Sequence, residues 1–246
     1  MGEVVYFGFD SSGLQAPVSN LLNFELDPLG VELNKLHGGK EYSDFLRCYA
    51  FQDHIKNTFI FRAPVTLDVE YVPDDRGFIV TNLHLDQRSF DTVVSTSSSI
   101  GYSRKTFKVL QFFPGCGLCL LAKGSSLPFS IHPANFHSTG ISTLPMITGT
   151  FDCGKWFRPL NMAVINKDKK NISIKRGDPL FYVKFHTDTP VDLRRVRVTE
   201  SMVQIARANG QFSNFVKGTP LNKLYEYFAT ARHKKVLMDE IRKQEE

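Results

Sequence analysis

A segment of strict polar–apolar alternation limits the fold of this chain more than any other feature. Residues 64–72 place four apolar side chains on one side of the backbone, and a period of two predicts a half-buried strand. These side chains are Val65, Leu67, Val69 and Tyr71. Residues 73–77 have the composition of a turn. The apolar run at 78–85 therefore predicts the returning strand of a hairpin.

Further short apolar runs predict more strands of this kind. They cover residues 106–113, 117–122, 160–165, 172–174 and 180–185. We expect residues 166–171, which carry four charges, to form a hairpin tip, and residues 176–179 to form a tight connection. The chain has 21 Phe, whose rings have no polar group and suit the space between packed layers. The sequence thus predicts a mainly β protein, an antiparallel sandwich or β-clip-like barrel.

The first 54 residues carry weaker signals. Residues 1–40 are rich in Gly, Pro, Ser and Asn, which predicts an irregular arm with short strands. Residues 41–54 predict one helix. Its common face is expected to contain Phe45, Cys48, Tyr49 and Gln52.

The period becomes helical near the C-terminus. Thr199 is a predicted N-cap, and Asn209–Gly210 is the predicted end of that helix. Residues 219–246 predict a last helix with Thr219 as its cap and Pro220 in its first turn. Its final turns are highly charged, so we expect them to be solvated or to meet a charged partner. Its apolar stripe consists of Leu221, Leu224, Tyr225 and Phe228.

These signals divide the chain into a β-rich domain, residues 1–198, and a helical tail, residues 199–246. The tail is expected to pack on that domain or on a partner subunit. A chain of 246 residues can bury a full core without disulfides, and four Cys is ordinary usage. The sequence shows no signal peptide and no apolar run of about 20 residues. We therefore expect a soluble cytoplasmic protein without membrane contact.

Charge is unevenly distributed along the chain. Residues 167–246 contain 17 Lys and Arg against 10 Asp and Glu, a net charge of +7. A basic C-terminal third suits nucleic acid, an acidic protein or an acidic neighbouring subunit, although a solvated surface has the same composition.

One Cys/His pattern has the spacing of a zinc finger: Cys116, Cys119, His132 and His137. A finger needs both histidines on one helix, and Pro133 would interrupt that helix. The cysteines also lie in a predicted strand. We therefore predict no zinc finger, no metal and no cofactor, and leave open a metal site of another kind. Asp53 and His54 are adjacent, so they point in different directions and do not form a facial metal triad.

The best candidate ligand-binding residues lie on predicted loops. Lys123, Ser125 and Ser126 combine a cation with two hydroxyls beside a flexible glycine, which predicts an anion cradle. Asn135 and Asp152 add directional groups between strands. Arg158 completes the predicted set of ligand-binding residues.

Two resemblances follow from residues 115–185. The succession HPANF, GTFD, WFRPLNMAVIN and IKRGDPLFYVKF resembles an uncharacterised family of β-rich phage and bacterial proteins. That resemblance implies a phage or bacterial origin and a place in the host cytoplasm or the virion. More distantly, residues 124–127, 149–152, 164–166 and 175–178 look like the β-clip core of dUTPases and dCTP deaminases. The catalytic residues of that family are missing, which implies nucleotide binding without its chemistry.

No nucleophile–base–acid set can be read from the sequence. The favoured hypothesis is a non-enzymatic phage-type protein that acts by assembly or binding, as a homo-oligomer or with a viral partner protein. The first alternative is a degenerate dUTPase-like protein that binds or scavenges nucleotides. The second alternative is a metal-dependent enzyme.

Overall fold

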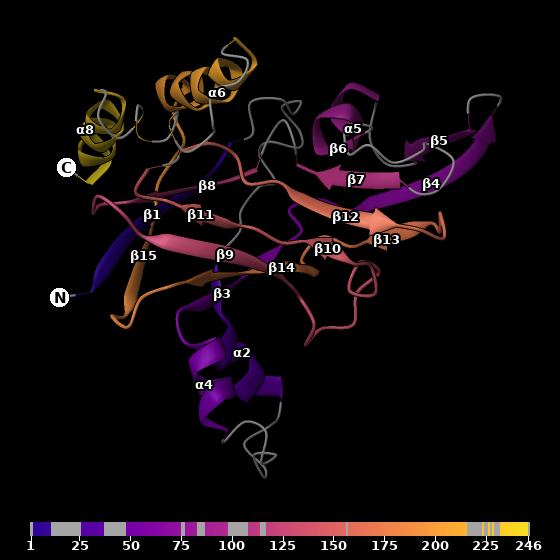
Figure 1. Ribbon diagram of the computed structural model, residues 1–246, viewed down its shortest axis with the longest axis horizontal. Helices are drawn as coiled ribbons and strands as arrows, with labels where there is room; N and C mark the ends of the chain where they lie inside the picture. The colour runs from indigo at the N-terminus through magenta and orange to yellow at the C-terminus, as the bar shows by residue number, and fades with distance from the viewer. Residues whose placement is uncertain are drawn as a thin grey trace.

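The computed structural model confirms a mainly β, sandwich-like fold (Figure 1). It describes residues 2–10, 26–36, 48–74, 77–82, 87–97, 108–113, 117–155, 157–215 and 232–245, together with residues 223, 226 and 228. The strands in this part of the chain form four sheets, and none of the four closes into a barrel. Every pairing is antiparallel except the parallel pair β1–β15.

The strands of the four sheets are two to eight residues long. The first has the order β15 (Val191–Arg195), β1 (Glu3–Asp10), β8 (Gly117–Ala122). The second is β10 (Met146–Ile147), β12 (Met162–Asn166), β7 (Lys108–Phe112), β6 (Val94–Ser97). The third is β11 (Thr150–Asp152), β9 (Pro128–Pro133), β14 (Pro179–Phe185), β3 (Thr58–Arg62), β2 (Asp27–Pro28). The fourth is β13 (Ile172–Ile174), β4 (Leu67–Asp74), β5 (Gly77–Asn82).

The hairpin that the alternating segment predicts is present as β4 and β5, which pair from Val69 opposite Asn82 to Asp74 opposite Gly77. Its apolar face lies in the main core. Leu67 and Val69 are fully buried there, while Thr66 is exposed. The same core contains phenylalanines from the first three sheets, so side chains without polar groups do fill the space between layers.

Strand β8 is buried on both faces, which explains its uninterrupted apolar sequence. Leu118 and Leu120 face the main core, whereas Cys119 and Leu121 face a second core under the C-terminal helices. Strand β1 divides in the same way, with Phe7 in the main core and Tyr6 in the second. An N-terminal arm of short irregular strands was therefore the wrong prediction for residues 3–10, which form a strand between β15 and β8.

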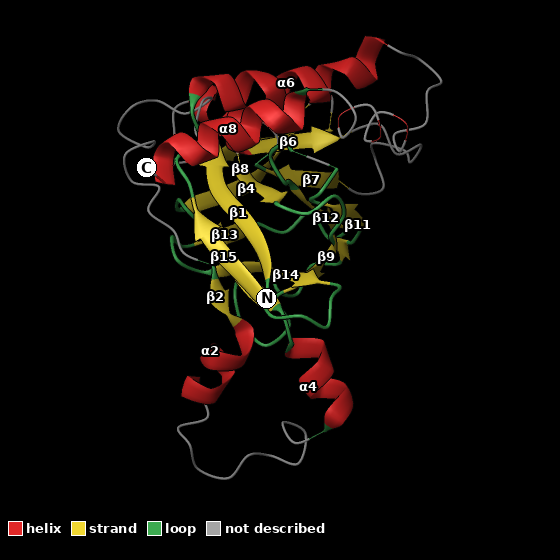
Figure 2. Ribbon diagram, turned by 90° about the vertical axis from the view of Figure 1, so that its left-hand side faces the viewer, coloured by secondary structure: helices red, strands yellow, loops and turns green. Residues whose placement is uncertain are grey.

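Five helices are described: α2 (Leu29–Leu36), α4 (Tyr49–Ile55), α5 (Gln87–Val93), α6 (Glu200–Phe215) and α8 (His233–Glu245). Helices α6 and α8 lie side by side at one end of the molecule, and α2 and α4 project at the opposite end (Figure 2). Met202 of α6 and Leu237 and Ile241 of α8 are fully buried against the outer face of β1 and β8. None of the described helices is long and apolar enough to cross a membrane.

The C-terminal predictions are partly wrong. Thr199 does cap α6, because its Oγ1 accepts a hydrogen bond from the Met202 N–H at 3.4 Å. The helix continues past Gly210 to Phe215, since an internal glycine costs only about 1 kcal/mol in a packed helix. Residues 219–246 are not one helix: residues 223, 226 and 228 are helical, but Arg232 lies in a turn before α8 begins. Thr219, Pro220, Leu221, Leu224 and Tyr225 lie outside the described residues.

Two other predictions made from local sequence are wrong. In both cases the residues pack or pair with segments far away in the chain. The last turns of the chain are not fully solvated, because Leu237 and Ile241 form a buried i, i+4 pair. Residues 166–171 are not a hairpin tip, because β12 pairs with β7 and β10 while β13 pairs with β4 in another sheet. The segment is a crossover between sheets.

The helix predicted over residues 41–54 is shorter and faces another way. Residues 41–47, with Phe45, lie outside the described part of the chain, and α4 begins after an extended Cys48. Cys48, Tyr49 and Gln52 are exposed, and Phe51 is the side chain that is buried. Phe51 is the one buried apolar side chain of this seven-residue helix, and Ile55 packs against the same hydrophobic cluster.

Candidate functional site

Ser126 and Asp152 come together where β9 begins and β11 ends. Asp152 pairs with Pro128, which places its carboxylate beside the preceding loop. The Ser126 hydroxyl donates to Asp152 Oδ2 at 2.5 Å. The backbone N–H groups of Leu127 and Gly154 each donate to Oδ1 at 2.9 Å. The donors of these loops therefore bind the protein's own carboxylate, and of the three residues of the predicted anion cradle only Ser126 takes part.

Asp152 is held in its charged form by these contacts. Burial alone would raise the pKa of Asp152, but the hydrogen bonds from Ser126, Leu127 and Gly154 lower it below its ordinary value. Gly154 allows the two loops to approach closely. A Cβ added there would lie 2.6 Å from the Ser125 backbone, closer than a real side chain allows.

Lys234 of α8 attaches the C-terminal helix to the same two loops. Its ammonium donates to the carbonyl oxygen of Gly124, and to that of Gly154 at 2.8 Å. The carbonyl groups of both loops thus contact an internal cation, while their N–H groups contact an internal anion. This arrangement gives Ser126 and Asp152 a structural role. Binding of an external ligand by these residues stays a prediction.

The remaining predicted residues do not all join this group. Lys123 and Ser125 are exposed on the loop itself. Asn135 follows β9 at the end opposite Pro128. The two ends of this strand lie roughly 16 Å apart at the usual rise of about 3.3 Å per residue. Arg158 is half-buried in the segment before β12. The predicted set is therefore divided between separate places.

The four residues of the zinc-finger spacing are also separated. Cys119 is buried beneath α6 and α8, and Cys116 lies outside the described residues. His132 lies on β9. His137 lies in the turn after β9 and contacts Tyr182 of β14. Within the described ranges, no three or more His, Cys, Asp or Glu side chains are placed to hold a metal ion.

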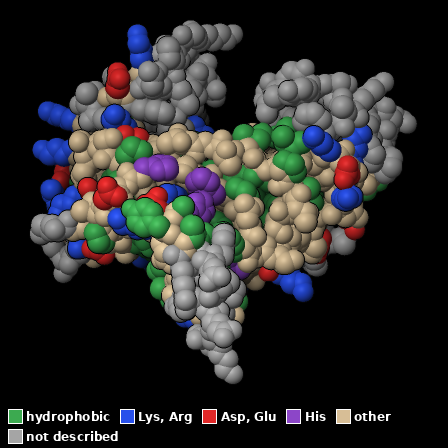
Figure 3. All heavy atoms as spheres, turned by 60° about the horizontal axis from the view of Figure 1, so that its bottom comes forward, with side chains coloured by type: hydrophobic (Ala, Val, Ile, Leu, Met, Phe, Trp, Pro, Cys, Tyr) green, Lys and Arg blue, Asp and Glu red, His purple; other side chains and the backbone are tan. Residues whose placement is uncertain are grey.

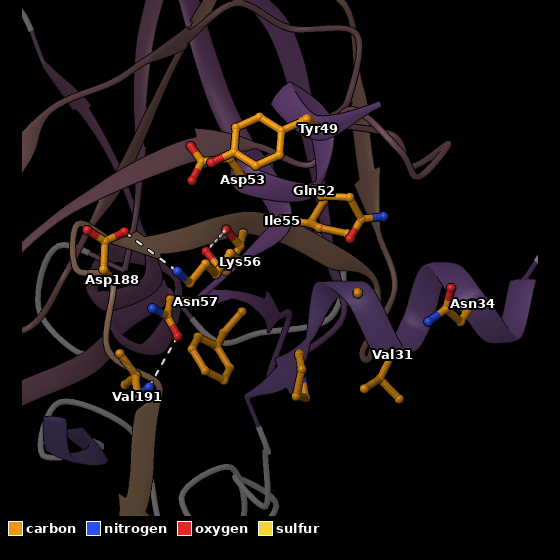
Figure 4. Close-up of a pocket in the computed structure, with 14 residues that line it drawn as sticks. Val31, Asn34, Tyr49, Gln52, Asp53, Ile55, Lys56, Asn57, Asp188 and Val191 are labelled. Carbon is orange, nitrogen blue, oxygen red and sulfur yellow. Dashed lines mark hydrogen bonds and ion pairs between the residues drawn. The ribbon is translucent and has the colours of Figure 1, made fainter. Parts of the chain in front are cut away.

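A cleft of about 630 Å³ lies between α2, α4 and the turn from β14 to β15 (Figure 4). Tyr49 and Asp53 border one side of it, and Val31 and Asn34 the other. The remaining residues of its lining are Pro28, Gly30, Gln52, Ile55, Lys56, Asn57, Thr58, Phe59, Asp188 and Val191. The lining thus combines apolar side chains, such as Ile55 and Phe59, with polar ones, and Lys56 and Asp188 form an ion pair of 3.6 Å.

Exposed apolar side chains are concentrated around this cleft. Six large hydrophobic residues are exposed in the described ranges, and three of them lie on α2 and α4. These are Val31 at 50%, Leu36 at 59% and Tyr49 at 87% exposure. We call the surface formed by α2, α4 and the cleft the α2–α4 face.

Asn57 and Arg62 fix the framework of this face. The Asn57 side-chain amide donates to the carbonyl oxygens of Thr187 and Thr189 at 2.9 and 2.8 Å, and its oxygen accepts from the Val191 N–H at 3.1 Å. Arg62 joins Asp27 and Glu32, at 3.0 and 2.9 Å. Asn57 thus holds the β14–β15 turn in place, and Arg62 holds the start of α2 against β3.

A histidine cluster lies beneath the other side of α4, formed by His54, His132, His186, Ser130 and Lys184. Histidine side chains gather on this side of the molecule (Figure 3). The buried Ser130 hydroxyl lies 2.7 Å from His132 Nε2 and 2.9 Å from His186 Nε2. The rings of His54 and His132 meet edge to face, with centroids 5.8 Å apart.

Lys184 of β14 binds the C-terminal end of α4. Its ammonium donates to the carbonyl oxygen of Asp53 at 2.5 Å, to that of His54 at 3.2 Å and to that of Lys56 at 3.5 Å. A cation at this end of a helix satisfies carbonyl groups that have no partner within the helix. α4 therefore depends on Phe51, on Lys184 and on the neighbouring imidazoles for its position.

The histidine cluster does not have the geometry of a hydrolytic site. A serine 2.7 Å from an imidazole nitrogen matches a nucleophile–base pair in distance. Ser130 is only 6% exposed, however, and lies inside a sheet with neighbours on both sides. In the described part of the chain, neither His132 nor His186 is hydrogen-bonded to a carboxylate that could orient it as a base.

Comparison with family models, with curated proteins and with solved structures gives no match to this chain. The two resemblances stated from the sequence therefore remain hypotheses. The α2–α4 face is the candidate functional site on geometry alone.

Sequence reasoning missed both the cleft and the cluster, although one signal was available. Asp53 and His54 do point in different directions: Asp53 borders the cleft, while His54 meets His132. Two adjacent polar residues on a short helix thus indicate that two sides of that helix contact functional or polar groups. Their partners at positions 132, 184 and 186 lie too far along the chain to be found by spacing.

Proposed function

We propose that this protein acts by assembly or binding, without catalysis, and that the α2–α4 face is its contact surface. The observation that carries the proposal is the concentration of exposed apolar side chains there, above all Tyr49 at 87% exposure. Aromatic residues at the centre of a contact supply much of its binding energy. Large apolar side chains grouped on a surface are typical of interaction sites.

The shape of the cleft favours a protein segment over a small molecule. Sites for small molecules enclose most of the ligand surface. Here the bordering side chains of Val31 and Tyr49 are themselves half or more exposed, so a small ligand would remain open to solvent. The polar side chains of the lining, among them Asn34, Gln52 and Asp53, suit hydrogen bonds beside an apolar anchor from a partner.

A second copy of the chain is the partner that we propose first. The C-terminal third is basic, with a net charge of +7, while the first 166 residues carry 13 Lys and Arg against 15 Asp and Glu. The charged residues of the cleft are Asp53, Lys56 and Asp188, which leaves one net negative charge. Opposite charges on two parts of one chain favour contact between copies. A viral partner protein, and a phage origin with a location in host cytoplasm or virion, are proposed on the resemblance alone.

Nucleotide binding at the Ser126–Asp152 loops is a weaker proposal. Asp152 would have to give up hydrogen bonds from Ser126, Leu127 and Gly154 before those donors could meet a phosphate. A nucleotide panel in a thermal-shift assay tests it. Ligand at a hundred times its dissociation constant should stabilise the protein by about 2.7 kcal/mol.

Replacing Tyr49 with alanine should weaken self-association about thirtyfold, because a central aromatic side chain is typically worth about 2 kcal/mol in a contact. Light scattering over a range of protein concentrations measures the dissociation constant. The matched control is Val72→Ala, which removes an exposed apolar side chain from β4, outside the α2–α4 face and the basic C-terminal third, and should leave the constant unchanged. A native protein that is monomeric at every concentration would contradict self-association. Equal constants for the native chain and Tyr49→Ala would contradict the α2–α4 face as the contact.

A further inference from the structure

Helix α4 is held in place by few contacts, although it forms one wall of the cleft. It has seven residues, and Phe51 is its one buried side chain. Phe51 packs edge to face on Phe136 at 5.3 Å. Elements with so little buried surface open at a low free-energy cost compared with the core. Ile55 and the contacts of Lys184 are the other attachments of α4, so a change of charge beneath the helix acts on one of the less firmly held elements of the fold.

The charges that face α4 come from three elements. On α4 and just after it these are Asp53, His54 and Lys56; β9 contributes His132; β14 and its end contribute Lys184 and His186. Phe136, in the turn after β9, and Thr58 of β3 complete the surroundings without charge. Two acids belong to these surroundings, Asp53 and Asp188 of the β14–β15 turn, and Asp188 pairs with Lys56 at 3.6 Å. On the histidine side of α4, the neighbouring groups from β9 and β14 are cations or groups that can become cations.

We infer that the histidine cluster is a pH-sensitive switch, which holds α4 on β9 and β14 while His54 and His132 are neutral and releases it when they are protonated. The Ser130 hydroxyl has a single proton, so it can donate a hydrogen bond to only one of its two histidine neighbours. A neutral His132 can accept the Ser130 proton, while the hydroxyl oxygen can accept from the second imidazole. A protonated His132 can only donate, so the buried hydroxyl loses this acceptor.

Protonation also adds positive charge beside Lys184. Burial lowers the pKa of His54 and of His132, and the charge of Lys184 lowers both further; Asp53 partly offsets this for His54. When α4 is released, His54 leaves the cluster and its pKa returns toward the ordinary value of 6.5, while His132 loses the nearby charge of His54. The released form thus binds more protons than the docked form. Docking is therefore stable above about pH 6.5 and weakens as the pH falls below it. The effect on partner binding rests on the function proposed above, whereas the opening of α4 does not.

Hydrogen exchange of the full-length protein at pH 7.5, 6.5 and 5.5, corrected for intrinsic rates, tests the switch. The relevant amides include those of Gln52 and Lys56, which donate to the carbonyl oxygens of Cys48 and Gln52 within α4. We expect their protection to fall on the order of tenfold between pH 7.5 and 5.5. Peptides from β14 should keep their protection. Unchanged protection in α4, or an equal loss in β14, would overturn the proposal.

A variant with His54→Gln and His132→Gln should lose this pH dependence, while the control His233→Gln on α8 should keep it. A double variant that still loses protection at low pH would overturn the assignment to these histidines. If the double variant does not fold, His54→Gln alone should reduce the pH dependence, and the series on the native protein still decides the main claim. Exchange is measured on dilute monomer, so a failure of self-association does not affect it.

Discussion

Replacing Phe61 with alanine should lower the free energy of unfolding by about 3–5 kcal/mol. Phe61 is fully buried on β3 and stacks on Phe181 of β14 at 4.8 Å. It also meets Phe113 edge to face at 6.2 Å. Alanine would remove the ring from the place where the strands of the third sheet meet the loop after β7, and the rigid core would not collapse into the space.

Chemical denaturation followed by fluorescence or circular dichroism measures this loss. Val72→Ala is the matched control, because Val72 lies on β4 but is 40% exposed, and it should cost less than about 1 kcal/mol. Phe61→Leu, which keeps most of the volume, should lie between the two. A loss below about 1 kcal/mol for Phe61→Ala would show that this part of the core is not packed as described.

Replacing Asp152 with alanine should cost about 2–4 kcal/mol, since three donors lose their acceptor and two of them are backbone groups. The control is Lys155→Ala. Lys155 lies 3.7 Å from Asp152 but is 42% exposed, and exposed ion pairs contribute little. Thermal and denaturant unfolding compare the two variants. Equal losses would contradict the role given to the hydrogen bonds.

The same carboxylate predicts a pH dependence in acid. The hydrogen bonds hold the pKa of Asp152 below its ordinary value of 3.8 in the folded protein. Its contribution to stability is therefore present above about pH 4 and is lost as the pH falls through the lower value of the folded state. Asp152→Ala should be less sensitive to acid in this range than the native chain.

Local pattern predicted those parts of the fold that depend on neighbours in sequence. The hairpin of β4 and β5 and the cap at Thr199 are such features. The parallel pairing of β1 with β15 joins Glu3 to Val191, and no local period indicates a partner so far away. β8 shows the same limit, since its apolar sequence does not reveal that Cys119 and Leu121 meet helices from the C-terminus.

The candidate residues show a similar division. Ser126 and Asp152 could each be chosen as loop residues from turn chemistry, but local pattern does not show that they meet, and Lys234, which contacts their loops, comes from α8. The α2–α4 face could not be predicted, because its main signal is the exposure of Tyr49, and the sequence favoured a common face for Tyr49 and Gln52 without saying which side is buried. The single anchor, Phe51, is apparent only once β9 and β14 are in place.

Cys48 offers the most direct test of the α2–α4 face. Its thiol is free and exposed at the start of α4, next to Tyr49, whereas Cys119 and Cys153 are buried. The rate at which a maleimide modifies Cys48, read by mass spectrometry of its peptide, can be compared between dilute protein and protein concentrated above its dissociation constant. We expect modification to slow markedly on association, and Tyr49→Ala to keep the fast rate under both conditions. A Cys48 rate that is unchanged in the associated native protein would contradict the α2–α4 face as the contact surface.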